Sequence, residues 1–239
     1  MIYCYFSCKV DERLLALSVK QLRAVDSDAV IYVANDERDR AAIPPGCREV
    51  LTRYNRGGSG TGIAAVEGEL LTMKHILERE KADYVVKIDS DVWLNDVEKL
   101  RPRYDGEPEP DFLGYETWKM LLPAGPLYRL SKWAVNAALE TTQSRWRARE
   151  WNPQAAYSEN LAIFHMVCLA PALRVQLIPW AAHGLVGMPD GEDVRAACWA
   201  DAVHCGEPLA DGSPITREHA LCRMLRLKTE LQLMKEHEN

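Results

Sequence analysis

The sequence predicts an α/β fold in which helices flank an open, mostly parallel β-sheet. Short apolar runs of strand length alternate with longer segments whose apolar residues recur at helical spacing, and this alternation is typical of parallel sheets with crossover helices. The chain has 239 residues, of which 47% are hydrophobic and 27% are charged. A chain of this length and composition buries a sizeable core, and α/β units of up to about 250 residues often form one domain.

The first hundred residues carry the clearest alternation. Residues 2–6 are an apolar and aromatic run typical of a buried strand. A stripe of apolar residues at helical spacing marks 63–77 as an amphipathic helix. The expected strands of this half are 2–6, 29–34, 49–51 and 84–88, and the expected helices are 11–25 and 63–77.

Polar residues follow the expected strands. Because the carboxyl ends of parallel strands meet at one edge of a sheet, where ligands of such sheets bind, we expect four polar segments to gather there. They are Ser7, Asp36, the glycine-rich loop 53–62 and the segment 89–91.

The second half of the chain is less periodic. Three prolines and a glycine among charged residues break regular structure at 101–110 and mark a boundary between the halves 1–100 and 101–239 of a single domain. The elements expected beyond it are a strand near 113–115, a Pro/Gly turn at 123–126, helices at 131–141, 158–168 and 217–235, a strand at 173–179, and a loop-rich stretch from 181 to 217.

Charge and cysteine content indicate the compartment and exclude some partners. The net charge of −6 gives no general attraction to nucleic acid or to anionic membranes. Seven scattered cysteines are an odd number, which a reducing cytoplasm tolerates. The sequence shows neither a signal-peptide pattern nor an apolar run of about 18 residues, so we expect a cytoplasmic protein with no membrane span.

Two carboxylates follow the strand at 84–88. Asp89 and Asp91 stand at i and i+2, and alternate residues of a strand share a face, so both can reach one cation at the sheet edge. Oxygen ligands of this kind suit Mg²⁺ or Mn²⁺, which carboxylates hold together with substrate phosphates. An isolated Asp-x-Asp is more often a solvated turn, and the strand-forming residues before this one favour the metal site.

Four short segments read LLTMK (70–74), YVVKIDSDVWLN (84–95), GPLYRLS (125–131) and SENLA (158–162). In this order they resemble the motifs Asn-Leu-Thr-x-Lys, Tyr-Val-x-Lys-x-Asp-x-Asp-x-Phe-x-Asn, Gly-x-x-Tyr-x-x-Ser and Glu-Asp-Val of the beta-1,3-glycosyltransferase family. That family contains galactosyl- and N-acetylglucosaminyltransferases related to Fringe. The resemblance covers about residues 63–205, and its most specific part is the Asp-x-Asp block.

The resemblance implies a GT-A fold and a metal-dependent glycosyltransferase that moves a hexose from a UDP-sugar to an acceptor hydroxyl. It implies Mn²⁺ or Mg²⁺ on Asp89 and Asp91, completed by a C-terminal histidine, for which His204 is the candidate and His183 the rival. Residues 1–100 would bind the nucleotide sugar and 101–239 the acceptor. The acceptor stays open between a glycan, a small molecule, a protein and a modified nucleobase.

Further residues are candidates for the donor. Asp36 is placed to accept from the uracil or ribose, and Ser7 has a similar position at a strand end. Arginine suits phosphate geometry, so the glycine-rich loop is a candidate for holding the base or the diphosphate. The donor-binding candidates are Ser7, Asp36, Arg53, Asn55, Arg56, Lys74, Asp89 and Ser90.

The catalytic base is where the sequence departs from the family. Inverting transfer needs a carboxylate to take the acceptor proton, and the Asp of Glu-Asp-Val is Asn160 here. Asparagine cannot act as a base, so Glu159 is the nearest candidate, and the stereochemical course stays open. Later carboxylates that could serve are Asp190, Glu192 and Asp193. Acceptor-side candidates are Trp118, Gly125 and Trp93, because sugar and base faces stack on indole.

Two other function classes fit part of the pattern. A phosphotransferase or phosphatase of the haloacid-dehalogenase type also places Asp-x-Asp after an apolar strand, but that motif follows the first strand, whereas three expected strands come first here. A non-catalytic nucleotide-sugar-binding protein is favoured by Asn160, and it would bind UDP with metal and show no transfer.

Overall fold

A computed structural model describes residues 1–52, 63–103, 106, 108–116, 123–147, 174–179, 185–187, 194–206 and 215–237. In chain order the elements are β1 (Ile2–Ser7), the short 3₁₀ helix η1 (Lys9–Asp11), α1 (Glu12–Val25), β2 (Val30–Asp36), β3 (Arg48–Thr52), α2 (Ile63–Glu80), β4 (Tyr84–Ile88), β5 (Val92–Leu94), the 3₁₀ helix η2 (Glu98–Leu100), β6 (Phe112–Glu116), β7 (Pro123–Ser131), α3 (Lys132–Arg147), β8 (Val175–Ile178), β9 (Leu185–Gly187), α5 (Val194–Cys198), β10 (Ala202–His204) and α6 (Arg217–His237).

Seven strands form the central sheet, in the order β3-β2-β1-β4-β7-β6-β8. The strands β3, β2, β1 and β4 run parallel to one another, and β8 runs parallel to β6. Only β7 among them is antiparallel to its neighbours, β4 and β6. The mixed, mostly parallel sheet expected from the sequence is therefore confirmed, and strands from both halves of the chain build it.

A second, smaller sheet joins distant parts of the chain. Its strand order is β5-β10-β9, with β10 antiparallel to β5 and parallel to β9. His204 of β10 pairs with Val92 of β5, and the Cys205 amide donates to the Asp91 carbonyl at 2.9 Å. The strand β10 is thereby fixed beside the residues that follow β4.

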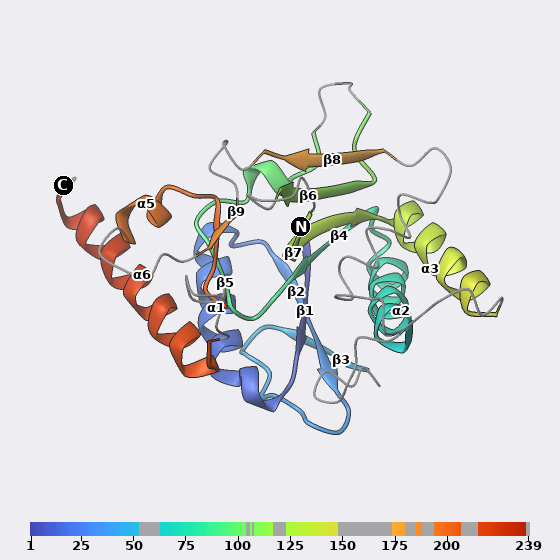
Figure 1. Ribbon diagram of the computed structural model, residues 1–239, viewed down its shortest axis with the longest axis horizontal. Coiled ribbons are helices and arrows are strands. Elements are labelled where there is room, and N and C mark those ends of the chain that lie inside the picture. The colour runs from blue at the N-terminus through green and yellow to red at the C-terminus, as the bar shows by residue number, and fades with distance from the viewer. Residues whose placement is uncertain are drawn as a thin grey trace.

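Helices cover both faces of the central sheet (Figure 1). The helices α2 and α3 pack side by side on one face, and α1 lies on the other face with α5 and α6 beyond it. In α2 the predicted stripe points into the core, where Val66, Leu70, Met73 and Leu77 are each at most 1% exposed. Amphipathic periodicity therefore predicted which face of this helix is buried.

The helix α1 is buried on two sides. Leu15, Val19 and Leu22 face the sheet, whereas Leu14 faces Leu221 and Met224 of α6 in a separate cluster. The terminal helix is thus held on the outside of α1, and its first residue, Arg217, reaches the start of α1.

One prediction for the second half is wrong. Residues 123–126 are not a turn but the start of β7. Proline is tolerated there because it stands at the strand start and beside a register shift between Gly114 and Glu116 of β6. In the stretch 181–217, which is expected to be loop-rich, the described residues form the short elements β9, α5 and β10. These elements have three to five residues each, and such lengths are too short for a periodic pattern.

Among the helices described, none combines the length and the apolar character needed to cross a membrane.

Candidate functional site

Polar side chains gather where β1, β2 and β4 end. Ser7 is the last residue of β1, Asp36 is the last residue of β2, and Asp89–Asp91 follow β4. All are buried to 9% exposure or less. Asp36 Oδ1 accepts a hydrogen bond from the Arg38 amide at 2.8 Å, which fixes this carboxylate at the strand end. The carboxyl edge of the sheet therefore holds the polar residues expected there, except for the loop 53–62, which lies outside the described residues.

Asp89 is held from the sheet side. Its amide donates to the Pro126 carbonyl at 2.9 Å, and its Oδ1 lies 2.7 Å from Lys87 Nζ. The Lys87 side chain is only 1% exposed and stands over the Tyr128 ring at 5.7 Å. Burying an ammonium group is costly unless a carboxylate compensates it, so this contact holds the Lys87 and Asp89 side chains together.

Asp91 faces the C-terminal part of the chain. Its Oδ1 lies 3.6 Å from His204 Nε2, and its Oδ2 accepts a hydrogen bond from Arg217 Nη1 at 3.1 Å. The carboxylate is 5% exposed. The structure thus brings the predicted pair Asp91 and His204 together, 113 residues apart in sequence numbering, through the pairing of β5 with β10.

Arg217 bridges two buried carboxylates. Besides Asp91 it contacts Asp11, whose Oδ1 lies 2.8 Å from Arg217 Nε. Asp11 is fully buried where η1 passes into α1. The arginine is the first residue of α6 and is 45% exposed, so its cation lies between the buried acids and solvent. Together these contacts fix the start of α6 against the end of β4.

Gly206 allows the close approach of these groups. A Cβ atom at this position would stand 2.2 Å from Asp91 Oδ2 and 2.9 Å from His204 Nε2. Both distances are below van der Waals contact, so any side chain would displace the carboxylate or the imidazole. The space in front of Asp91 and His204 therefore depends on this glycine.

The donor set at this point fits a divalent cation. Carboxylate oxygen and imidazole nitrogen are ligands that Mn²⁺ accepts, and the remaining positions of such ions are commonly filled by water and substrate phosphate. Within the described ranges no three His, Cys, Asp or Glu side chains converge on one point. Asp91 and His204 therefore fit the role of two protein ligands whose ion is completed by a bound substrate.

Two hydroxyls at the same edge have no hydrogen-bond partner among the described residues. Ser7 Oγ and Ser90 Oγ are buried donors, and buried polar groups of native proteins are nearly always paired. Unsatisfied hydroxyls at a strand edge indicate a place where ligand or water atoms belong. That both serines face the donor stays a prediction.

The environment of Cys205, next to Asp91, shifts the pKa of its thiol. Burial, reinforced by the Asp91 carboxylate, raises the pKa of the Cys205 thiol, and the guanidinium of Arg223 opposes the effect. The thiol is therefore neutral near pH 7 and acts as a packing residue rather than a nucleophile.

Other predicted residues lie elsewhere or outside the described ranges. Lys74 lies on α2 with its Nζ 4.0 Å from a Glu78 carboxylate oxygen. Trp93 is not a stacking surface for an acceptor, because it is 2% exposed in the core between β5 and α6 and donates from Nε1 to Asn95 at 3.0 Å. Gly125 belongs to β7. The candidates outside the described residues are Arg53, Asn55, Arg56, Trp118, Glu159, Asn160, His183, Asp190, Glu192 and Asp193.

Four residues of the site were missed from the sequence as site residues. Lys87 was taken as part of a strand, and Asp11 as an ordinary acid in the first turn of a helix. Arg217 gave no signal, because its partner is 126 residues away. Gly206 carried a weak signal, since it stands two residues after the candidate ligand His204.

Comparison with solved structures decides the fold. No family model matches the sequence, and no curated protein does. An active-site mutant of LgtC superposes with a TM-score of 0.58 at 14% identity, over 96% of this chain and 96% of that one. A glycosyltransferase involved in glycosylation of the major capsid of PBCV-1 gives a TM-score of 0.57 at 14% identity, over 94% and 98% of the two chains. The fold is that of GT-A glycosyltransferases.

A third GT-A-like structure, the glycosyltransferase GlyE of Streptococcus pneumoniae TIGR4, gives a TM-score of 0.55 at 13% identity. The match covers 94% of this chain and 60% of that one. The GT-A fold implied by the Asp-x-Asp segment is thus confirmed. Membership of the narrower Fringe-related family stays a prediction.

Proposed function

We propose that this chain is a metal-dependent glycosyltransferase that transfers a sugar from a nucleotide-sugar donor to an acceptor hydroxyl. The observation that carries the proposal is the meeting of Asp91, His204 and Gly206 at the carboxyl edge of a GT-A sheet. In open α/β sheets this edge is where ligands bind. The glycosyltransferase structures that the chain resembles support the same reaction class.

The donor would lie across the ends of β1, β2 and β4. We propose that Asp36 accepts a hydrogen bond from the base or ribose, and that the Ser7 and Ser90 hydroxyls, which lack partners among the described residues, hydrogen-bond donor atoms. A UDP-sugar is the donor that the sequence motifs favour. Arg53 and Asn55 are proposed donor contacts from the glycine-rich loop.

Asp91 and His204 would hold Mn²⁺ or Mg²⁺, with Asp89 beside them. When bound, the ion would neutralise negative charge on the nucleoside diphosphate as it leaves. The chain supplies cations of its own at this edge. Lys87 Nζ lies 2.7 Å from Asp89 Oδ1, and we propose that the partly exposed guanidinium of Arg217 contacts a diphosphate oxygen.

The acceptor side and the proton acceptor are proposed from the sequence. Glu159 is the nearest candidate for the base, and Trp118 and Gly125 are candidates for the acceptor cleft. The acceptor can be a glycan, a small molecule, a protein or a modified nucleobase.

The test is release of nucleoside diphosphate from a panel of nucleotide sugars, with Mn²⁺ and with EDTA. We expect slow hydrolysis of one donor that requires metal and is stimulated by the correct acceptor. Asp91→Asn should lower the rate at least about 100-fold, because the ion contributes several kcal/mol of charge stabilisation. Asp28→Asn is the matched control, since Asp28 is exposed and precedes β2.

Other outcomes separate the competing functions. Metal-dependent nucleotide binding with neither hydrolysis nor transfer would indicate a binding protein. Hydrolysis of p-nitrophenyl phosphate that requires Asp89, without nucleotide-sugar turnover, would indicate a phosphatase and contradict the proposal.

A further inference from the structure

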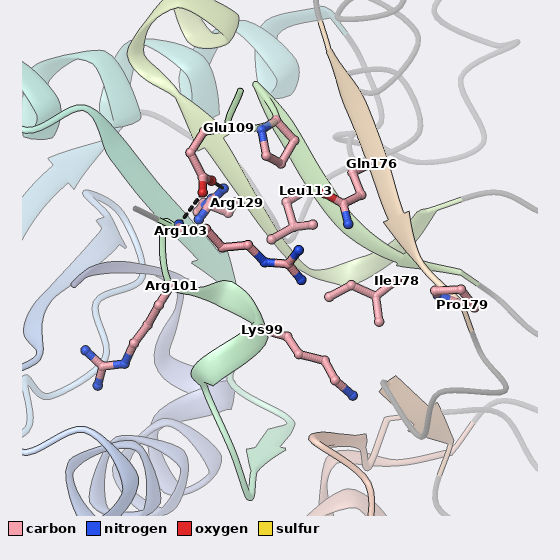
Figure 2. A pocket seen from close by; sticks show the side chains of 10 residues that line it. Lys99, Arg101, Arg103, Glu109, Leu113, Arg129, Gln176, Ile178 and Pro179 are labelled. Atoms are coloured by element: carbon pink, nitrogen blue, oxygen red, sulfur yellow. Dashed lines mark hydrogen bonds and ion pairs between the residues drawn. The ribbon is translucent and has the colours of Figure 1, made fainter. Parts of the chain in front are cut away.

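A second pocket lies on the sheet away from the end of β4 (Figure 2). Its walls come from η2, from the segment after η2, from β6 and β7, and from the end of β8. We call it the β6–β8 pocket. Its volume is about 210 Å³, smaller than the roughly 300–1,000 Å³ of pockets for drug-sized ligands. The size suits a small molecule or one end of a larger one.

The pocket is separate from the donor edge. Arg129 of β7 pairs with Val86 of β4, Leu113 of β6 pairs with Arg129, and Gln176 of β8 pairs with Leu113. This row crosses the sheet three residues before Asp89, roughly 10 Å along the strand. Val86 and Leu113 belong to the core cluster on the α1 face, so the pocket opens on that face, beyond the part that α1 covers.

The lining is strongly basic. It contains four cationic side chains and one carboxylate among the described residues, namely Lys99, Arg101, Arg103, Arg129 and Glu109. Two of these cations form ion pairs with carboxylates outside the pocket. Lys99 Nζ lies 2.8 Å from an Asp201 oxygen, and Arg101 lies 3.3 Å from Asp26. Figure 2 shows Arg101 turned away from the pocket.

Arg129 is a fixed, buried cation in the wall. It is 1% exposed, donates from Nη1 to the Leu100 carbonyl at 2.9 Å and pairs through Nη2 with Glu109. Its Nε has no acceptor in the part of the chain that the structure describes. A buried donor left unpaired is costly, so this nitrogen indicates an acceptor that the described residues do not supply.

Arg103 points its charge into the pocket. Its amide donates to a Glu109 oxygen, whereas its guanidinium makes no hydrogen bond or ion pair with the described residues. In Figure 2 the side chain extends across the pocket toward Leu113 and Ile178, and the Gln176 amide points into the same space. One guanidinium that has no ion-pair partner among the described residues, one amide and two apolar side chains thus face a common volume.

We propose that the β6–β8 pocket binds a small organic oxyanion, a carboxylate or a phosphate group joined to a short apolar body. The planar guanidinium of Arg103 matches two oxygens of such a group, and the Gln176 amide offers a further donor. Leu113 and Ile178 would contact the apolar part of the ligand. Small-molecule pockets commonly combine an apolar lining with a few polar groups that orient the ligand. This proposal does not depend on the glycosyltransferase function.

The test is binding of butyrate, butyramide and inorganic phosphate at constant ionic strength, followed through the side-chain amide signals of ¹⁵N-labelled protein. We expect saturable binding of at least one anion, with a dissociation constant on the order of millimolar, and no binding of neutral butyramide. Arg103→Ala should weaken anion binding at least about tenfold, because a charge-assisted pair is lost. Arg103→Lys keeps the positive charge and loses the two-pronged guanidinium geometry. Its affinity for the anion should lie between those of the wild type and Arg103→Ala.

Arg174→Ala is the matched control. Arg174 is 54% exposed on the residue before β8 and pairs with Asp111, so its removal changes the net charge equally and should leave binding within about twofold. Butyrate alone would assign a carboxylate ligand, phosphate alone a phosphate ligand, and both a general oxyanion site. The proposal is wrong if neither anion saturates, if butyramide binds as well as butyrate, or if Arg103→Ala and Arg174→Ala behave alike.

Discussion

Arg217 donates from Nη1 to Asp91 Oδ2 at 3.1 Å, and this contact joins the first residue of the last helix to the carboxylate that follows β4. The same guanidinium lies 2.8 Å from Asp11, which is fully buried. One side-chain cation therefore contacts two acids at the point where we propose a divalent ion. The arginine and the ion would act on the same carboxylate, which makes their effects on stability measurable against each other.

Replacing Arg217 tests this relationship. Arg217→Gln should lower the free energy of unfolding by about 1–3 kcal/mol in EDTA, because Asp11 and Asp91 lose their cation while staying buried. The value is below that of a fully buried pair because Arg217 is 45% exposed. Mn²⁺ should stabilise the variant more than it stabilises the wild type. Urea unfolding with Mn²⁺ and with EDTA measures both effects.

Arg13→Gln is the control for this experiment. Arg13 also links α1 to α6, but both Arg13 and its partner Glu218 are well exposed, at 71% and 67%. Its loss should cost no more than about 0.5 kcal/mol and leave the Mn²⁺ effect unchanged. Equal Mn²⁺ stabilisation of Arg217→Gln and wild type would show that the ion does not act on Asp91.

Gly206→Ala should remove metal-dependent nucleotide binding. The added Cβ would stand 2.2 Å from Asp91 Oδ2, so the carboxylate or β10 must move. We expect a stability loss of about 1–3 kcal/mol and an affinity loss measurable by titration calorimetry. At Gly106 a Cβ meets nothing within 4 Å and the backbone has φ +89, so Gly106→Ala should cost stability alone. Wild-type affinity in Gly206→Ala would mean that the space in front of Asp91 is not used.

The pair of Lys87 and Asp89 should behave as a buried ion pair. Lys87→Met leaves a buried carboxylate without its cation at 2.7 Å, and the free energy of unfolding should fall by about 3 kcal/mol. Adding Asp89→Asn removes the carboxylate that Lys87 contacts and should restore part of the loss. A double-mutant cycle in urea gives the coupling energy. Strictly additive losses would show that the two groups do not interact.

Stability at alkaline pH should report on Cys205. The folded state raises the pKa of this thiol above its unfolded value of about 8.5, through burial first and Asp91 second. The folded state therefore favours the neutral thiol. Its contribution is fully present below about pH 8.5 and is lost as the pH rises above that value, by up to about 1.4 kcal/mol per pH unit. The difference between wild-type and Cys205→Ala unfolding curves from pH 7 to 10 isolates it, and a flat difference would contradict the assignment.

The sequence predicted the fold where local pattern and tertiary structure agree. The run 84–88 is β4, and the stripe in 63–77 is the buried face of α2. The sequence-based prediction failed for β7, where prolines suggested a turn. A register shift in β6, opposite these prolines, allows them to stand in an interior strand of the sheet. Sequence patterns did not predict β9 and β10, because strands of three residues are held by their neighbours rather than by their own periodicity.

The site was predictable only in part. Spacing after a strand identified Asp89 and Asp91, but residues 90 and 91 form a turn, so the alternation that would put both on one face ends at Asp89. The two carboxylates accordingly have different partners, Lys87 for one and Arg217 with His204 for the other. The contact between Asp91 and His204 joins residues more than a hundred positions apart. It depends on the pairing of β5 with β10, which no local sequence pattern predicts.

The most direct test of the proposed donor site is thermal unfolding with UDP and Mn²⁺, with UDP and EDTA, and in the variant Asp91→Ala. At about 100 times its dissociation constant a ligand adds roughly 2.7 kcal/mol, or roughly 5–10 °C for a chain of this size. We predict a shift of this order for the wild type with UDP and Mn²⁺ together, little shift in EDTA, and none in Asp91→Ala. An equal shift in the wild type and Asp91→Ala, or no shift with any nucleotide tried in place of UDP, would contradict a metal-dependent nucleotide-sugar site at the end of β4.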